Sequence, residues 1–201
     1  GTQGIWVSGC MGFPDIYEHT GAIIKLNRDG SADISSGTVD IGSGQIATLC
    51  QIAAAELGVG MDKVRMVYAD TDTVPFDAPT HASRGTYSSG LAVKAAAAQV
   101  RKRVFEIAAG LMEANPDDLD ISNGQVYVKG SPDSARPLTD IIHIAESPFI
   151  MDTEQGPRPS SPPEHKGTII GSSSLAPPEN PSPATALFVE VEVDTETGQV
   201  A

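Results

Sequence analysis

The sequence predicts an α+β fold in which hairpins and two main helices pack on a sheet. Short stretches in which apolar and polar residues alternate indicate strands, and two longer stretches with apolar residues three or four positions apart indicate helices. These elements follow one another without a regular strand–helix–strand repeat, which favours α+β over α/β.

The first predicted strands lie near the N-terminus. Residues 3–12 combine small and apolar residues and predict a strand. Residues 21–41 predict a hairpin that turns at 27–30 (NRDG), because apolar residues alternate on both sides of this turn. Its second strand is expected to continue through residue 41 into the glycines that follow. The alternating apolar positions are Ala22, Ile24, Leu26, Ala32 and Ile34.

Two amphipathic helices and a strand come next. Residues 45–57 place apolar side chains on a single helical face, and Gly58 stands where a left-handed C-terminal cap is expected. Residues 63–69 alternate as a strand does. Residues 85–113 predict a longer helix that ends before Pro116. The apolar positions are Ile46, Leu49, Cys50, Ala53, Ala54 and Leu57 in the first helix, Val64, Met66 and Tyr68 in the strand, and Val93, Val100, Val104, Ile107 and Leu111 in the second helix.

Shorter elements are expected after the long helix. Residues 119–129 predict a hairpin about Asn123-Gly124, which is a strong turn signal. Residues 138–146 predict a short helix capped by Thr139.

The C-terminal part is divided by a segment rich in Pro and Ser. Residues 148–183 show no apolar period and are expected to be irregular, whereas residues 187–193 (LFVEVEV) alternate as a strand with one buried face. We therefore expect residues 1–147 to form the core and residues 184–201 to form a strand and a turn that return to it. Both ends look like cuts in a longer polypeptide.

Composition and charge exclude several classes of function. The net charge is −13 and the densest basic cluster is residues 101–103, so neither a nucleic-acid nor an anionic membrane surface is expected as a partner. No apolar run approaches the roughly 18 residues of a membrane span, and no signal peptide opens the chain, so a cytoplasmic location is expected. Cys10 and Cys50 form no CxxC pair, which argues against a zinc or iron–sulfur site within this chain. Cys50 is expected to be a buried thiol.

The first candidate site is the sequence DIGSGQIAT at 40–48, which joins a strand end to a helix start. Free backbone N–H groups and the helix dipole favour an anion there, and glycines permit its close approach. Ser43 or Thr48 could add a hydroxyl. A second interpretation is a relaxed dinucleotide fingerprint of Rossmann type with Asp70 as the ribose acid, and a third is a tight turn without a ligand.

The second candidate site is the long polar loop that follows Asp70. The loop does not match an EF-hand calcium site, because its sixth and twelfth positions are Pro75 and His81 rather than Gly and Glu. Ser83 is a plausible helix N-cap. Arg84 pairs either with an anionic ligand or with a neighbouring aspartate. No metal-binding spacing surrounds His81, and no hydrolase motif is present.

Taken together, these segments resemble the molybdopterin-binding subunit of the xanthine dehydrogenase and aldehyde oxidase family of molybdenum hydroxylases. The similarity lies in the order and spacing of several motifs and is densest over residues 21–109. The matching segments are Gly42-Ser43-Gly44, QIAAAELG at 51–58, DTDTVP at 70–75 and Ala82-Ser83-Arg84, with VEVEVDTETGQV at 189–200 as a further match. The family has Gln between its two glycines, whereas this chain has Ser43 there and a Gln at position 45.

The resemblance implies a molybdenum–pyranopterin cofactor, often a cytosine dinucleotide, ligated by the dithiolene of the pterin and not by protein. It implies that Ala82 lies beside the metal, that Ser83 contacts the cofactor and that His81 borders the pocket of a small-molecule substrate. The predicted cofactor-binding residues are Gly42, Ser43, Gly44, Gln45, Thr48, Ala82, Ser83 and Arg84.

The resemblance also implies which parts of the enzyme lie elsewhere. The family hydroxylates, or in some members reduces, aldehydes, purines and aromatic or heterocyclic compounds. Its general-base glutamate motif and its FGG-type loop are absent from this sequence, so no catalytic residue is predicted and the isolated chain is expected to be inactive. The expected partners are the remainder of the molybdenum subunit and the iron–sulfur (2Fe–2S) and flavin (FAD) subunits or domains.

Overall fold

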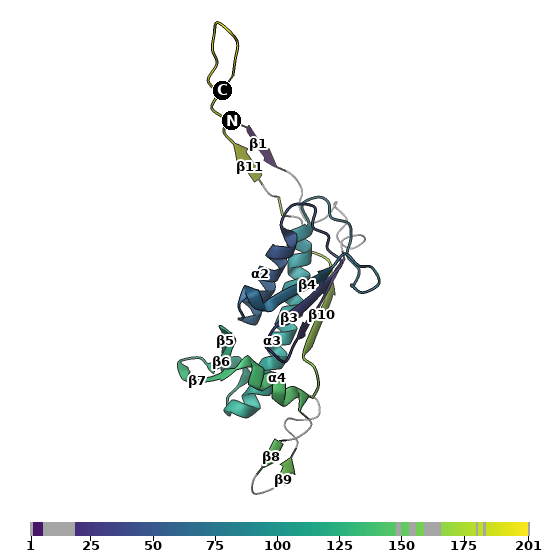
Figure 1. Ribbon diagram of the computed structural model, residues 1–201, viewed down its shortest axis with the longest axis vertical. Helices are drawn as coiled ribbons and strands as arrows, with labels where there is room; N and C mark the ends of the chain where they lie inside the picture. Colours follow the sequence, from purple (N-terminus) through teal and green to yellow (C-terminus); the bar gives the residue numbers. More distant parts are fainter. Residues whose placement is uncertain are drawn as a thin grey trace.

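The structure is a computed structural model that describes residues 2–5, 19–147, 150–152, 156–158, 166–179, 181–182 and 184–200. Its main body is a four-stranded sheet in the order β10-β2-β3-β4, with helices α2 and α3 packed on one face (Figure 1). The strands are β2 (Thr20–Leu26), β3 (Ala32–Ser36), β4 (Val64–Tyr68) and β10 (Ile170–Leu175), and the helices are α2 (Gln45–Leu57) and α3 (Gly90–Met112). The α+β prediction is confirmed.

The pairing of the sheet is mixed. β2 pairs antiparallel with both β10 and β3, whereas β3 pairs parallel with β4 through a crossover that contains α2. A Rossmann-type module would need a larger parallel sheet. The described residues offer a single parallel pair in this sheet, so the nucleotide-binding alternative is not supported.

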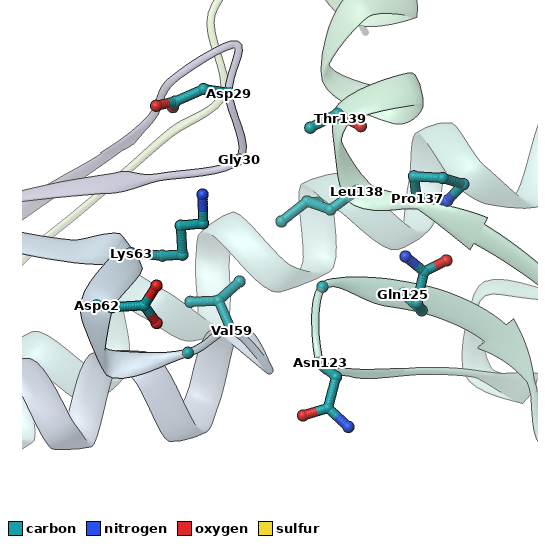
Figure 2. Close-up of a pocket in the computed structure, with 12 residues that line it drawn as sticks. Asp29, Gly30, Val59, Asp62, Lys63, Asn123, Gln125, Pro137, Leu138 and Thr139 are labelled. Atoms are coloured by element: carbon teal, nitrogen blue, oxygen red, sulfur yellow. The ribbon is translucent and has the colours of Figure 1, made fainter.

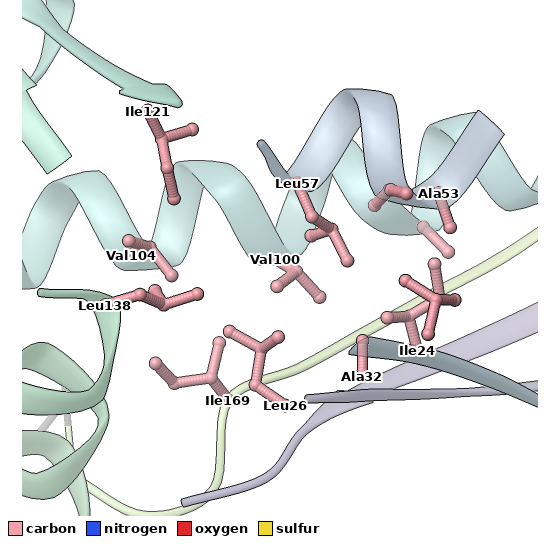
Figure 3. Packing of buried hydrophobic residues seen from close by; sticks show 14 of the residues in the cluster. Ile24, Leu26, Ala32, Ala53, Leu57, Val100, Val104, Ile121, Leu138 and Ile169 are labelled. Atoms are coloured by element: carbon pink, nitrogen blue, oxygen red, sulfur yellow. The ribbon is translucent and has the colours of Figure 1, made fainter. Parts of the chain in front are cut away.

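The predicted apolar periods build the core. Every second residue of β2 and β3 faces the helices, and the inward side chains meet Ala53 and Leu57 of α2 and Val100 of α3 (Figure 3). Gly58 adopts φ 63° and closes α2 as the sequence predicts. The fully buried positions of the sheet are Ala22, Ile24, Leu26, Ala32 and Ile34.

A small three-stranded sheet and a short helix pack at one end of the main body, drawn below the four-stranded sheet in Figure 1. The hairpin of β5 (Leu119–Ser122) and β6 (Gln125–Val128) turns at Asn123 and Gly124, which both have positive φ, as this pair favours. β7 (Ser131–Pro137) completes a three-stranded sheet and leads into α4 (Leu138–Glu146). Leu119, Val126 and Leu138 join the same core.

Short elements complete the chain. The 3₁₀ turns η1 (Met61–Lys63) and η3 (Pro116–Asp118) precede β4 and β5, and a π-helical turn, η2 (Gly85–Ser89), precedes α3. β8 (Ile150–Asp152) pairs with β9 (Gly156–Arg158). β1 (Thr2–Ile5) pairs with β11 (Ala184–Leu187) in an arm that extends away from the body (Figure 1). No helix in the described part of the chain is long and apolar enough to cross a membrane.

Several element boundaries differ from the prediction. β3 ends at Ser36 rather than near residue 41, because Thr38 turns inward to a buried polar cluster described below. α4 begins after Pro137, so Thr139 lies inside the helix and is not its cap. Tyr68 is exposed and does not face the core. Of the predicted strand 3–12, residues 6–12 lie outside the described residues.

The C-terminal prediction was wrong in two places. The segment 148–183 contains the paired strands β8 and β9 and also contributes β10, which is an edge strand of the main sheet. The strand predicted at 187–193 is not formed: β11 ends at Leu187, and Phe188 and Val189 are 87% and 78% exposed. Alternation alone did not supply a surface on which these residues could be buried.

Candidate functional site

Two loops leave the main sheet at the same edge. The loop 37–44 follows β3 and enters α2, and the loop 69–84 follows β4 and enters η2. Because β3 and β4 are parallel, their carboxyl ends lie side by side, so the two loops begin next to each other. The structure thus brings the two candidate sites of the sequence together.

Gln45 and Gly85 form the contact between the loops. A Cβ atom added to Gly85 would lie 1.1 Å from Nε2 of Gln45, so the carboxamide occupies the space that a side chain at position 85 would fill. Gln45 is only 4% exposed, and its Oε1 has no hydrogen-bond partner among the described residues. A buried acceptor without a partner costs free energy, so this oxygen lacks a hydrogen bond that the described residues do not supply.

The glycine turn is held by an aspartate. Asp40 Oδ1 accepts hydrogen bonds from the backbone N–H groups of Gly42 (2.9 Å) and Gly44 (3.2 Å), and Oδ2 accepts one from Ile46 (3.5 Å). The bond from Gly42 is the largest cause of a lowered pKa of the Asp40 carboxyl, against a smaller opposing effect of desolvation. The backbone N–H groups at this helix start therefore converge on an anion, as expected, and that anion is the Asp40 carboxylate of the chain itself.

The two glycines are required by backbone conformation. Gly42 and Gly44 have φ values of 97° and 72°, which side chains disfavour. A Cβ atom at either position would meet no heavy atom of the described chain within 4 Å, so the turn faces open space. Thr48 uses its hydroxyl to donate to the Gly44 carbonyl (3.1 Å), and Ser43 is exposed.

The second loop contains a strained turn. Ala82 and Ser83 have φ values of 46° and 54°, and two successive non-glycine residues in this region cost free energy. The N–H of Arg84 donates to the His81 carbonyl (3.0 Å) and closes the turn. Ser83 does not cap the following helix, because that helix begins in η2 with Arg84 as its first flanking residue. Such π-helical turns are frequent at functional sites.

Arg84 pairs with a neighbouring aspartate. Its Nη1 lies 3.1 Å from Oδ1 of Asp77, and the two side chains are 1% and 3% exposed. The guanidinium also donates to the Ala78 carbonyl (2.6 Å) and to the Thr20 hydroxyl (2.5 Å). Of the two roles considered for Arg84, the structure has the internal ion pair, so its side chain points into the protein.

Sequence reasoning missed four residues that build this site. Asp40, Asp77, Thr20 and Gly85 hold or shape the two loops, but none stood out as a candidate. For Asp40 a signal existed, since an aspartate two residues before a glycine turn commonly accepts the turn's N–H groups. His81, which sequence analysis placed beside a substrate, is partly buried in the second loop. In the described part of the chain, no group of three His, Cys, Asp or Glu residues is arranged to hold a metal ion.

A separate cavity lies at the opposite end of the sheet. It has a volume of about 380 Å³, and Figure 2 shows Lys63 and the β2–β3 turn at Asp29 on one side of it and the start of α4 at Leu138 and Thr139 on the other. None of the predicted site residues lines it. The cavity is therefore distinct from the two loops that meet at Gln45.

Similar proteins provide an independent comparison. The chain is 28% identical over 183 residues to a xanthine dehydrogenase molybdenum-binding subunit of Escherichia coli O157:H7, covering 90% of this chain and 23% of that protein. It is also 28% identical over 177 residues to the carbon monoxide dehydrogenase large chain of Afipia carboxidovorans, covering 88% of this chain and 20% of that one. The chain thus spans about a quarter or less of the curated relatives it matches.

A solved structure shares the fold. Quinoline 2-oxidoreductase from Pseudomonas putida 86 superposes with a TM-score of 0.75 at 24% identity, over 98% of this chain and 25% of that chain. The sequence profile described as "Molybdopterin cofactor-binding domain" matches residues 3–201. The chain belongs to this family of molybdopterin cofactor-binding domains.

Proposed function

We propose that this chain forms one wall of the molybdenum–pyranopterin site of an oxidoreductase that hydroxylates or reduces a small aldehyde, purine, or aromatic or heterocyclic substrate. The observation that supports the proposal best is the buried, unpartnered Oε1 of Gln45 at the place where both loops meet. The residues present fit such a cofactor. The Gln45 oxygen could accept a hydrogen bond from an N–H group of a pterin, and the two adjoining turns are already formed in the absence of the cofactor.

The residues that would hold the cofactor come from both loops. Gln45 would accept a hydrogen bond from it, the Ser43 hydroxyl would lie on the exposed side of the glycine turn, and the turn at Ala82 and Ser83 would offer small side chains next to it. Asp40 keeps the glycine turn formed before the cofactor binds. Arg84 would act through its backbone and its ion pair and not by direct charge contact.

When bound, the cofactor would supply a metal that accepts or donates electron pairs. This chain's residues would bind and orient it, and His81 would border the substrate. We further propose a cytosine dinucleotide form of the cofactor, iron–sulfur (2Fe–2S) and FAD groups on partner subunits or domains, and a cytoplasmic location. The general base would come from the remainder of the subunit, so the isolated 201-residue chain is expected to show no turnover.

The proposal is tested on the full-length protein that contains this chain. Purified protein should carry close to stoichiometric molybdenum by elemental mass spectrometry, together with a releasable pterin. A protein that is well folded but lacks both, after expression in a host that makes the cofactor, would refute the assignment.

Gly85→Ala tests the role of Gln45. The added Cβ would collide with Nε2, the far end of a flexible side chain, so the carboxamide would swing away at little cost in stability. We expect thermal unfolding close to wild type but about fivefold weaker retention of molybdenum on dialysis, as the loss of one hydrogen bond implies. Gly110→Ala, in α3 with no heavy atom of the described chain within 4 Å of the new Cβ, is the matched control. Equal molybdenum retention in both variants would show that Gln45 does not bind the cofactor.

A further inference from the structure

A buried polar cluster lies beneath the two loops. It joins the start of β2, the end of β3, the loop segment 75–78 and η2 through side-chain hydrogen bonds. The members of this Asp77 cluster are Thr20, Ser36, Thr38, Asp77, Arg84 and Ser89. From it we infer that Asp77 is a positioning residue that fixes the two cofactor loops relative to each other, an inference that rests on the proposed function.

The carboxylate of Asp77 is shared between the loops. Oδ1 accepts from Arg84 (3.1 Å), which follows the strained turn, and from Thr20 (2.6 Å) in β2. Oδ2 accepts from Thr38 (2.9 Å), which begins the loop that carries the glycine turn. One buried group thus binds the second loop to the first, and both to the sheet.

The segment around Asp77 cannot shift without breaking close contacts. A Cβ atom on Gly37 would lie 2.8 Å from the Pro75 carbonyl oxygen and 2.9 Å from the Cβ of Asp77, and one on Gly21 would lie 2.7 Å from the Cβ of Pro75. Backbone hydrogen bonds run from Gly21 to the Phe76 carbonyl (2.8 Å) and from Ala78 to the His19 carbonyl (3.2 Å). Residues 75–78 therefore lie against the start of β2, where Thr20 and Asp77 form an isolated antiparallel bridge.

This arrangement clamps the strained turn at both ends. Arg84 donates to the Ala78 carbonyl as well as to Asp77, so the five residues between Ala78 and Arg84 are bridged by one side chain. Left-handed conformations at Ala82 and Ser83 persist only where the surroundings determine them. The ion pair between Arg84 and Asp77 holds the turn in this conformation, because a buried guanidinium is stable only next to its carboxylate.

The cluster also reaches the contact between Gln45 and Gly85. The Thr38 hydroxyl lies 2.7 Å from Oγ of Ser89, in the same π-helical turn as Gly85. A displacement of Asp77 would therefore move Thr38 and Arg84 together. The expected effect is a change in the spacing of the loops and not only a loss of stability.

The test uses two variants of the full-length protein. Asp77→Asn removes the anion at constant size and deletes its ion pair with Arg84. The double variant Asp77→Asn with Arg84→Gln removes that buried charge as well, and is expected to unfold close to the wild-type temperature. Asp72→Asn, the same substitution at an exposed position of the same loop, is the control.

Hydrogen exchange measures the turn directly. In both variants, but not in the control, peptides that span 79–86 should exchange about tenfold faster, and molybdenum retention on dialysis should fall. Wild-type exchange at 79–86 in the double variant would overturn the inference, and so would faster exchange with undiminished molybdenum retention. Absence of molybdenum from the wild-type protein would instead refute the proposed function, while the exchange result would still decide whether Asp77 holds the turn.

Discussion

Gly171 in β10 lies against the backbone of α3, and Gly171→Ala is expected to lower stability strongly. A Cβ atom at this position would lie 2.1 Å from the carbonyl oxygen of Ala96 and 2.9 Å from a methyl group of Val100. The strand is held at this distance by its neighbours, since Ser173 donates to the Ala92 carbonyl (2.7 Å) and Ser172 to Gln99 Oε1 (3.2 Å). The clash is with a carbonyl inside a helix, which cannot rotate away.

The size of the effect follows from this contact. Overpacking in a core costs about 1–3 kcal/mol, and a clash with backbone belongs at the upper end. For a chain of this length, about 3 kcal/mol corresponds to a fall in melting temperature of roughly 6–12 °C. Guanidinium unfolding should show a lower midpoint with an unchanged slope, because the native and unfolded surfaces stay the same.

Gly110→Ala adds the same methyl group but is expected to raise stability rather than lower it. Gly110 lies in α3 with no atom of the described chain within 4 Å of an added Cβ, so the substitution should stabilise the helix by about 0.5–1 kcal/mol. If Gly171→Ala melts at or above the wild-type temperature, β10 does not pack on α3 as described. If both variants destabilise equally, the effect is not specific to the contact.

Two further predictions concern α2. Leu49→Ala empties a fully buried position between helix and sheet and should lower the free energy of unfolding, measured with urea, by about 2–5 kcal/mol. A loss below about 1 kcal/mol, as for an ordinary surface substitution, would contradict the packing of this face. Asp40 has a lowered pKa, so its stabilisation of the glycine turn is present above the ordinary value of 3.8 and is lost as the pH falls through the lower folded value. Asp40→Asn should therefore raise amide exchange at the start of α2 at neutral pH, and the difference from wild type should vanish in acid; a difference that grows in acid would show that Asp40 acts in another way.

Local patterns predicted the elements whose stability is local. The period of α2 and the glycine that ends it gave both helix limits, and the Asn123-Gly124 pair gave the second hairpin. In each case the determining residues are neighbours in sequence. Their conformation depends little on the rest of the chain.

The missed elements depend on distant partners. β10 contains the run GSSSL, which has no apolar period, and becomes a strand because β2 offers an open edge and the small residues of α3 admit Gly171. β3 ends early because Thr38 is drawn to Asp77 in the other loop. Neither cause can be read from a local window.

The candidate site was accessible to sequence reasoning only in outline. That two loops would meet follows from their positions after two successive strands. The role of Arg84 could not be decided, because it depends on where Asp77 lies. The same holds for Gln45, whose burial depends on a glycine forty positions away in a different element.

The place of β10 has a consequence for how the chain acquires its shape. β2, near the start, receives its second neighbour only from the segment at 170–175, close to the other end. During synthesis on the ribosome, the free edge of β2 and the part of α3 that β10 covers must therefore stay exposed until β10 has been made. A nascent chain would expose an unpaired strand edge for that whole period, so we expect chaperone dependence to fall if a permuted gene places β10 directly before β2.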